Sequence, residues 1–393
     1  MDLGLSEEQE MLRQFARDFL EKECPESHVR DMEEDDRGYS QELWAKMAEQ
    51  GWMGLVVPEA YGGVGMGYLD LIILVEEFGR ALVPGPFIPN CVATIALLEA
   101  ADEAQKQAHL PAIASGRQVW TLAFTEPSAR FDAAGVRLAA QRDPSTSLRA
   151  GGDGYVLNGT KLFIRDSHVA DKLVVVARTG PSTLRPGSGQ ASAEDGVSLF
   201  AVDAGAAGVR HTPVRTIASD KQNEVRFENV RVPAAARLGE EGRAWPVFQR
   251  IANKATVLEC AYLVGLSQQA FDITVNYTKE RNQFGRPIAS FQALQHKAAD
   301  MATDVDGCRY ITYKAAWAVA EDEPDADEQV HVAKAWVSDA SRRVVANAQQ
   351  MHGGIGFTKD YKIQLYFRRQ KAAELAWGDA DFHREGLAQA LGI

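Results

Sequence analysis

The spacing of hydrophobic residues in the first third of the chain predicts a set of amphipathic helices. The first begins at Ser6 and Gln9, which are placed as in a capping box, and its apolar stripe ends at Cys24 and Pro25. A glycine-rich loop at 56–67 does not fit the GxGxxG pattern because position 68 is tyrosine, which argues against a Rossmann dinucleotide site. Three more helices are predicted at about 40–51, 69–81 and 92–104, the last two separated by prolines at 84–89.

The hydrophobic period changes from helical to alternating near Gln118. Short runs of β-branched and aromatic residues, separated by turn residues, then predict a compact all-β domain, either a sandwich or a barrel. Two insertions rich in Ser, Gly and Pro, at 143–154 and 180–196, are expected to be hairpin ends, and nothing in them indicates a role. The predicted strands lie at 119–124, 162–164, 173–177, 197–202 and 225–227.

From Trp245 onward the pattern is helical again. Long helices joined by short loops are typical of an antiparallel helical bundle. The sequence therefore predicts a multidomain α+β fold with an N-terminal helical domain at 1–118, a β domain at 119–237, and a C-terminal four-helix bundle at 238–393. The bundle helices are predicted at about 248–281, 290–320 and 329–351, with two more at 359–375 and 379–391.

Composition narrows the possible functions. The chain has 393 residues, so more than one domain is expected. Its net charge of -12 disfavours binding to nucleic acid or to an anionic membrane surface. The four cysteines are far apart without zinc-ligand spacing, and no apolar run reaches membrane length, so we expect buried, reduced thiols and no membrane insertion. The acidic first residues do not look like a signal peptide, and a cytoplasmic location is expected.

The stretch between the third and fourth bundle helices holds candidate chemistry. Glycines at 353, 354 and 356 follow Gln350 and His352, whose amide and imidazole groups lie on the last turn of the preceding helix. Glycine lets another group approach the main chain closely, so this stretch could hold a cofactor, but it could equally be a simple joint between helices.

A second candidate lies where the first long bundle helix ends. Arg281 and Arg286 flank a glycine turn and could present two cations to a diphosphate. From spacing alone, capping of the helix C-terminus by these cations is the favoured interpretation. In the β domain, Thr125 follows a strand and could hydrogen-bond a heteroaromatic ring, while Phe163 could stack on one, although both are common turn and core residues.

Taken together, these segments resemble the acyl-CoA dehydrogenase family, and the resemblance covers nearly the whole chain in the same order. Each motif is weak alone, but the ordered set is specific. The motifs are Pro58-Glu59-Ala60-Tyr61-Gly62-Gly63, Thr125-Glu126-Pro127, Gly159-x-Lys161-x-Phe163-Ile164, Val225-x-Phe227-x-x-Val230-x-Val232-Pro233, Arg281-x-x-Phe284-Gly285-x-x-Ile288-x-x-Phe291-Gln292 and Gln350-x-x-Gly353-Gly354-x-Gly356.

This resemblance implies FAD held between the β domain and the bundle, with a neighbouring subunit completing the site in a homodimer or homotetramer. It also implies oxidation of an acyl-CoA thioester to the 2,3-enoyl-CoA, with electrons passed to an electron-transferring flavoprotein. Carried over by position, the FAD-contacting residues are Phe124, Thr125, Phe163, Arg165, Arg281, Gln283, Phe284, Gln292, Gln350, Gly353, Gly354, Asp379 and Asp381, and the substrate-contacting residues are Phe131, Thr256 and Trp377.

The sequence departs from the family where the catalytic base is expected. In many members the base is a glutamate directly before a glycine, 24 residues after the first glycine of the Gly-Gly pair, and that count from Gly353 reaches Trp377. An indole cannot accept the α-proton, so Trp377 is expected to form a wall of the acyl pocket or to plug it. Other members place the glutamate on the first bundle helix, where the matching residue is Ala255.

Two other carboxylates are candidates for the base. Glu259 is one turn from Ala255, a shift of about 6 Å, and is otherwise expected to form a helix-surface or interhelix salt bridge. Asp379 is close in sequence to Trp377 but is also placed as the N-cap of the last helix. Further departures are Phe131 for a serine, Arg165 for a small hydroxyl facing flavin N5, and Thr256 for an arginine that helps to bind CoA.

Three interpretations follow. The chain is an active dehydrogenase for an unusual acyl-CoA, such as a cyclic, branched or steroid side-chain thioester, with Glu259, Asp379 or a partner chain as the base. Alternatively, it is the subunit without a base in a heteromer, sharing FAD with a paralogue that performs the chemistry. The third interpretation, a flavin-free scaffold, is disfavoured by the many matches at cofactor positions.

Overall fold

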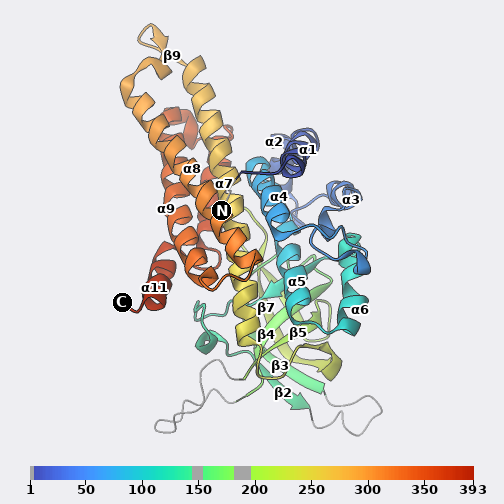
Figure 1. The fold of residues 1–393 in the computed structure, drawn as a ribbon. Helices are drawn as coiled ribbons and strands as arrows, with labels where there is room; N and C mark the ends of the chain where they lie inside the picture. Colours follow the sequence, from blue (N-terminus) through green and yellow to red (C-terminus); the bar gives the residue numbers. More distant parts are fainter. Residues whose placement is uncertain (1–3, 144–153, 181–195) are drawn as a thin grey trace.

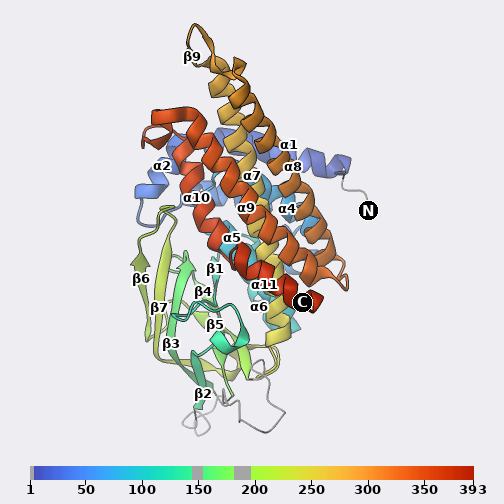
Figure 2. The same ribbon diagram turned by 90° about the vertical axis from the view of Figure 1, so that its left-hand side faces the viewer.

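The computed structural model describes residues 4–143, 154–180 and 196–393, so most of the two Ser/Gly/Pro-rich insertions lies outside the described residues. Figures 1 and 2 show a helical N-terminal part, a β domain and a long helical bundle, which confirms the predicted fold class. Along the described chain, none of the helices combines the length and apolarity needed to cross a bilayer. All four cysteines are buried and free, as predicted.

The N-terminal part contains two helices that the hydrophobic pattern did not predict, α2 and α6. The capping box at Ser6 is present, and Ser40 caps α3 as expected. The helix predicted from about 92 begins earlier, at Phe87, because Pro89 is accommodated in its first turn, where a missing N–H costs little. The helices are α1 (Glu7–Glu23), α2 (Glu26–Glu34), α3 (Gln41–Glu49), α4 (Tyr68–Ala81), α5 (Phe87–Ala100) and α6 (Glu103–Ala114).

The strands of the β domain form one continuous sheet in the order β6-β7-β3-β2-β4-β5-β8, and β1 pairs in parallel with β4. Hydrophobic residues of β4 alternate between two cores: Val174 and Val176 face the helices, while Leu173 and Val175 face the opposite side. The strands are β1 (Trp120–Ala123), β2 (Ala139–Asp143), β3 (Gly154–Arg165), β4 (Lys172–Arg178), β5 (Val197–Asp203), β6 (Val209–Val214), β7 (Gln222–Pro233) and β8 (Arg237–Leu238).

The C-terminal bundle begins with a helix of 36 residues, α7, and a short hairpin projects from its far end (Figure 1). A five-residue 3-10 helix at Gly353–Phe357 occupies the glycine-rich joint. The elements are α7 (Trp245–Glu280), β9 (Asn282–Gln283), β10 (Arg286–Pro287), α8 (Gln292–Ala320), α9 (Ala326–His352), α10 (Ile363–Leu375) and α11 (Ala380–Leu391).

The first helical domain is joined to the bundle by close packing of α4 on α7. A Cβ added to Gly265 would lie 1.7 Å from the carbonyl oxygen of Glu76, and one added to Gly79 would lie 2.0 Å from that of Tyr262. Glycine at both positions therefore lets the two helix backbones touch. This contact fixes the helical layer against which the β domain packs and so helps to define the interdomain cavity described next.

Candidate functional site

A fully buried lysine fixes the loop that follows β1. The Lys161 ammonium donates hydrogen bonds to the carbonyl oxygen of Phe124 at 2.9 Å and to Glu126 Oε1 at 2.7 Å. The Glu126 carboxylate also accepts from the backbone N–H groups of Arg137 and Leu138. Burial lowers the pKa of Lys161 to about 8. The loop at 124–126 is therefore held rigidly against β3.

The same loop brings Thr125 beside Phe163. The Leu162 N–H donates to the Thr125 carbonyl oxygen at 2.8 Å. The pairing of β3 with β7 is irregular between Lys161 and Ile164, and Phe163 lies in that irregularity with a φ of 57°. This conformation is costly for a bulky side chain, and it leaves the Phe163 ring 51% exposed. An exposed aromatic side chain thus lies close to Thr125 in the fold.

A cavity of about 470 Å³ lies between the β domain, α5 and α10. It brings together six of the residues that the sequence singles out: Phe124, Thr125, Phe131, Phe163, Arg165 and Trp377. Three lining residues carry positive charge (Arg165, Arg215 and Lys371), and Asp220 is the carboxylate among the described lining residues. The volume is in the range of a small-molecule or cofactor site.

Trp377 forms one wall of this cavity, and its predicted contact with the acyl group stays a prediction. It lies in the turn after α10 with a φ of 60°, and its ring is nearly parallel to that of Phe124, with centroids 6.4 Å apart. Phe131 and Phe248 pack on Phe124 from other directions. An aromatic cluster therefore occupies the side of the cavity where the family resemblance places the catalytic carboxylate.

Glu259 lies behind the cavity wall and not in the cavity. Its side chain is fully buried, and its Oε1 accepts a hydrogen bond from Nη2 of Arg165, the last residue of β3. Its Oε2 has no partner. Burial lowers the pKa of the Arg165 guanidinium. Glu259 thus forms a salt bridge, but the bridge is buried and runs to a strand, whereas the sequence led us to expect one on the helix surface or between helices. Arg165 stands between Glu259 and the space where a ligand would bind.

The remaining candidates near Trp377 are engaged elsewhere. Asp379 is the N-cap of α11 and accepts from the Phe382 N–H at 3.0 Å. Asp381 is exposed and pairs with Arg384 at 2.7 Å. Thr256 is buried, and its hydroxyl donates to the Ala252 carbonyl oxygen of its own helix at 2.7 Å. None of these three side chains lines the cavity, so their predicted contacts with ligands find no support in this single chain.

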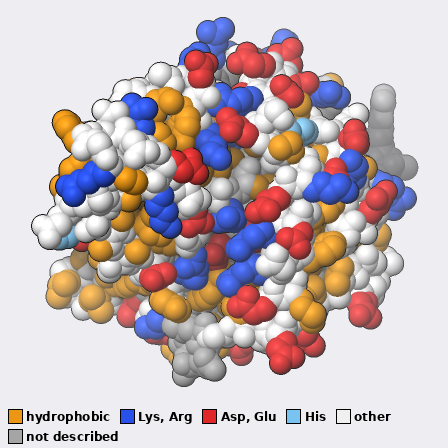
Figure 3. All heavy atoms as spheres, turned by 90° about the horizontal axis from the view of Figure 1, so that it is seen from above, with side chains coloured by type: hydrophobic (Ala, Val, Ile, Leu, Met, Phe, Trp, Pro, Cys, Tyr) orange, Lys and Arg blue, Asp and Glu red, His pale blue; other side chains and the backbone are white. Residues whose placement is uncertain are grey.

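A second group of predicted residues lies at the end of the bundle farthest from the sheet. Phe284 is 92% exposed at the tip of the hairpin that carries Arg281 and Gln283, and Gln292 opens the next helix. Gln350 precedes the glycine turn, where a Cβ added at Gly353 or Gly354 would meet nothing within 4 Å. These groups are open to an incoming ligand, but they do not line the chain's own cavity. Acidic, basic and hydrophobic side chains are interspersed over this end of the molecule (Figure 3).

Comparisons with known proteins agree with this arrangement. Three family models match in order: the acyl-CoA dehydrogenase N-terminal domain at residues 6–117, the middle domain at 121–230 and the C-terminal domain at 242–392. The chain belongs to the acyl-CoA dehydrogenase family. It is 34% identical over 397 residues to acryloyl-CoA reductase (NADH) of Anaerotignum propionicum, covering 100% of this chain and 96% of that protein.

Two further matches concern assemblies. The subunit CarC of the caffeyl-CoA reductase-Etf complex of Acetobacterium woodii is 32% identical over 369 residues, covering 92% of each chain. The crystal structure of the ChsE4-ChsE5 complex from Mycobacterium tuberculosis matches with a TM-score of 0.87 and 27% identity, covering 100% of this chain and 99% of that one. The chain is therefore an oxidoreductase of the acyl-CoA dehydrogenase family.

Acyl-CoA dehydrogenases are FAD-dependent, and the cavity of this chain suits a flavin ring. The exposed Phe163 ring offers a stacking surface, and Thr125 offers a hydroxyl beside it. The open glycine turn at 353–354 would let a phosphate or sugar of a cofactor held by a neighbouring subunit approach the backbone of this chain. Which residues contact FAD remains a prediction.

Sequence reasoning missed several residues that shape the site. Lys161 belongs to a recognised motif, but its role in holding the 124–126 loop is visible only in the structure. Lys334 is buried beside the turn that carries Trp377. The sequence could have marked it, because it is a lysine in the otherwise apolar stripe of α9 that includes Val330 and Val337. Asp220 and Lys371 reach the cavity from a loop and from α10, and no sequence pattern marks them.

Proposed function

We propose that this chain is the flavin-binding subunit of an acyl-CoA dehydrogenase in which another chain supplies the catalytic carboxylate. One observation carries this proposal. The cavity presents an exposed aromatic ring and a hydroxyl suited to a flavin, yet the turn that holds the base in many family members carries Trp377, whose ring forms a cavity wall. The chain would thus contribute cofactor binding to an α,β-dehydrogenation that it does not complete alone.

The expected roles of the cavity residues follow from their chemistry. FAD, when bound, accepts the β-hydrogen of the acyl-CoA as a hydride while a base removes the α-proton. Phe163 would cover one face of the ring system, and Thr125 would hydrogen-bond its edge. Arg165 would place a positive charge beside the reacting region, where it favours negative charge that develops in the transition state.

Available carboxylates in this chain do not fit the task of the base. Glu259 is paired with Arg165 and fully buried, and Asp379 is engaged as a helix N-cap. Asp220 lines the cavity, but it accepts hydrogen bonds from Thr216 at 2.5 Å and Gln222 at 2.6 Å. A base must lie within hydrogen-bond reach of the carbon-bound proton, and each of these three carboxylates already has a role within the chain that would hold it away from that task.

The comparisons support an assembly. One of the structures that share this fold is that of a complex of two differently named components, ChsE4 and ChsE5. The relative from Acetobacterium woodii is a subunit of a reductase-Etf complex. We therefore propose a heteromer with a paralogous chain, and an electron-transferring flavoprotein as the redox partner.

A second candidate function is a self-sufficient dehydrogenase that uses Glu259 as its base. The observation that favours it is that the buried Glu259 Oε2 has no hydrogen-bond partner. Arg165, its ion-pair partner, separates Glu259 from the cavity. This function requires Arg165 to release the carboxylate when acyl-CoA binds. The two candidates predict different behaviour of the chain expressed alone.

Expression alone and with a paralogous chain distinguishes them. We expect FAD absorbance from the co-expressed pair, and anaerobic bleaching of that flavin by one member of an acyl-CoA panel. The chain alone should bind little FAD, or bind FAD that acyl-CoA does not bleach. Bleaching by the chain alone that is lost in Glu259→Gln, but kept in Asp379→Asn and in the surface control Glu321→Gln, would instead establish the self-sufficient enzyme. Colourless protein in both preparations would contradict both functions.

A further inference from the structure

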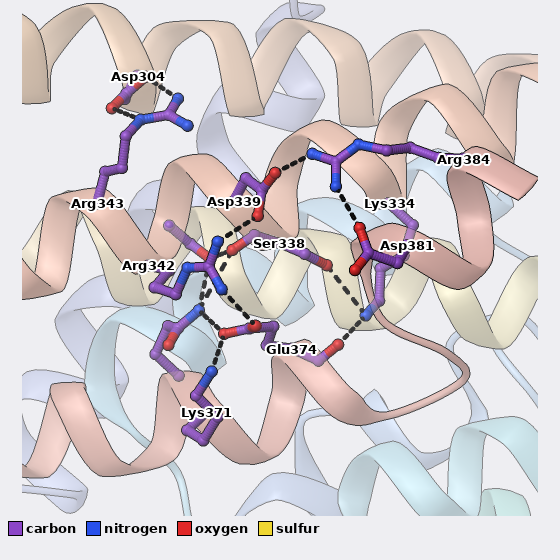
Figure 4. Close-up of polar contacts among 12 residues, drawn as sticks. Asp304, Lys334, Ser338, Asp339, Arg342, Arg343, Lys371, Glu374, Asp381 and Arg384 are labelled. Atoms are coloured by element: carbon purple, nitrogen blue, oxygen red, sulfur yellow. Dashed lines mark hydrogen bonds and ion pairs between the residues drawn. The ribbon is translucent and has the colours of Figure 1, made fainter.

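A buried lysine of α9, Lys334, hydrogen-bonds the backbone of the turn that carries Trp377. Lys334 lies in the middle of α9, and its side chain is fully buried. Its ammonium donates to the carbonyl oxygens of Glu374 at 2.6 Å, Gly378 at 2.9 Å and Ala373 at 3.3 Å. Figure 4 shows the Lys334 side chain reaching from α9 toward the backbone of Glu374 at the end of α10.

These contacts fix the backbone on both sides of Trp377. An ammonium has three N–H donors, and here three carbonyl oxygens before and after Trp377 surround it. Two of these carbonyls belong to the last turn of α10, which lacks intrahelical partners. The Trp377 carbonyl oxygen itself accepts from His383 Nε2 at 3.0 Å. Hydrogen bonds therefore hold the backbone of the turn at 373–374, 377 and 378, while the indole forms part of the cavity wall.

The histidine contact is consistent with a neutral ring. Burial lowers the pKa of His383 to about 3, so the ring carries one proton. That proton is on Nε2, which donates to Trp377, and Nδ1 then accepts from His331 Nδ1 at 2.9 Å. Lys334 is thus the cationic member of the set, and Trp377 can keep its strained φ of 60° because surrounding groups over-determine the turn.

We propose that Lys334 is a positioning residue that fixes Trp377 as the cavity wall and thereby limits the ligands that the site accepts. The part that concerns ligands rests on the proposed function. Simple capping of α10 by Lys334 would stabilise the fold but would not need the contact with Gly378, which lies beyond the helix. The contact across the turn is what links the lysine to the orientation of the indole.

Lys334 also makes the turn sensitive to pH. Burial lowers the pKa of Lys334 to about 8, and a neutral amine has only two N–H donors for the three carbonyls. Cys260 and His383 do not titrate in that range, since burial raises the pKa of the Cys260 thiol to about 12 and lowers that of His383 to about 3. The charged or titratable groups that face Lys334 from α7, β3, α10 and α11 are Cys260, Arg165, Glu374, Asp379 and His383.

The test uses protein labelled with 5-fluorotryptophan, in which the chain's seven tryptophans give separate ¹⁹F lines and Trp377→Phe assigns one of them. In Lys334→Met we expect the Trp377 line to shift and to at least double in width, while those of Trp44 and Trp52 stay in place. Arg342→Met is the matched control, because Arg342 lies two turns along α9 and contacts only side chains, Asp339 and Glu374 (Figure 4). An unchanged Trp377 line in a folded Lys334→Met protein overturns the proposal.

Two further measurements complete the test. In the wild-type protein the Trp377 line should move with a midpoint near pH 8, and a line that is flat from pH 7 to about 9.5 contradicts the pH sensitivity of the turn. If Lys334→Met fails to fold, Lys334→Gln, which cannot supply three N–H donors, replaces it, and an unchanged Trp377 line there overturns the proposal. In flavin-loaded protein, we compare the Kd for a long straight-chain acyl-CoA with the Kd for a short one. Lys334→Met should lower the ratio of the long-chain Kd to the short-chain Kd about ten-fold. An unchanged ratio contradicts the effect on ligands. The ¹⁹F lines can be recorded without flavin. A protein that fails to bind flavin or to act on acyl-CoA can therefore still show whether Lys334 positions Trp377.

Discussion

Arg165 and Glu259 form an ion pair across the wall of the cavity, with very different access to solvent. The Arg165 side chain is 27% exposed, whereas that of Glu259 is fully buried. The arginine can thus respond to whatever occupies the cavity, and the carboxylate depends on the arginine for its charge compensation. The ion pair therefore joins a residue at the cavity to a buried residue of α7. Because of the asymmetry, removal of one residue should change the free energy of unfolding more than removal of the other.

Removing Arg165 should destabilise the protein more than removing Glu259. Arg165→Met leaves an uncompensated carboxylate in the interior, a loss typically of about 3–5 kcal/mol. Glu259→Met leaves a guanidinium that can turn toward the cavity, so its cost should be smaller. Thermal unfolding of the two variants provides the comparison.

The double variant gives the control for that comparison. Arg165→Met with Glu259→Met removes both charges, and replacement of a buried pair by apolar groups is often neutral or stabilising. We therefore expect the double variant to melt above Arg165→Met. If Arg165→Met melts at or above the temperature of Glu259→Met, the buried carboxylate does not depend on the arginine.

Trp377→Glu should place a carboxylate where the family resemblance expects the base. The residue keeps its cavity-facing position, because the turn is held by backbone contacts that do not involve the indole. We expect flavin-loaded Trp377→Glu to be bleached anaerobically by an acyl-CoA without a partner chain. Trp377→Gln, which has the same shape but cannot accept the proton, should stay yellow. Equal bleaching of the two variants would show that the new carboxylate does not act as the base.

The architecture was largely predictable because hydrophobic periodicity reports which face of each element is buried. The long bundle helices and the strand at 173–177 were recognised in this way. Helices α2 and α6 were not predicted because they are short, and few of their residues are buried. Strand β6 was missed because only partly buried and exposed residues line it, so no alternation marks it.

The candidate site was only partly predictable for a different reason. Family motifs located Thr125, Phe163 and Trp377, and the structure brings all three to one cavity. The ion pair between Arg165 and Glu259 joins residues 94 positions apart, and no local pattern encodes such a contact. Lys334 acts through backbone carbonyls, which every residue has, so its partners leave no mark in the sequence. The contacts predicted for Arg281 and Gly353 with a neighbouring subunit's cofactor stay predictions, because neither residue lines the cavity of this chain.

Gly265→Ala should strongly destabilise the joint between the N-terminal helices and the bundle. The added Cβ would lie 1.7 Å from the Glu76 carbonyl oxygen and 2.8 Å from the Arg80 backbone nitrogen, so α4 and α7 must separate. Overpacking of this kind typically costs about 1–3 kcal/mol or more. Gly205→Ala, where the new Cβ meets nothing within 4 Å, is the control. Thermal unfolding should show a lower midpoint for Gly265→Ala alone; equal midpoints would mean that the helices separate at no cost.

Lys161 should make the stability of the protein depend on pH in a defined direction. Its pKa is about 8 in the folded state and 10.5 when exposed, so between these values the unfolded state binds more protons. The contribution of Lys161 to the free energy of unfolding therefore rises with pH from about 8 to 10.5 and is lowest below pH 8.

The cysteine thiols, which titrate above pH 8.5 once unfolding exposes them, also change the stability in this range, so the wild type must be compared with Lys161→Met at each pH. The advantage in melting temperature of the wild type over this variant should grow between pH 7.5 and about 9.5. An advantage that is constant or shrinks with pH would show that Lys161 remains fully charged in the folded protein, held by Glu126 and the Phe124 carbonyl.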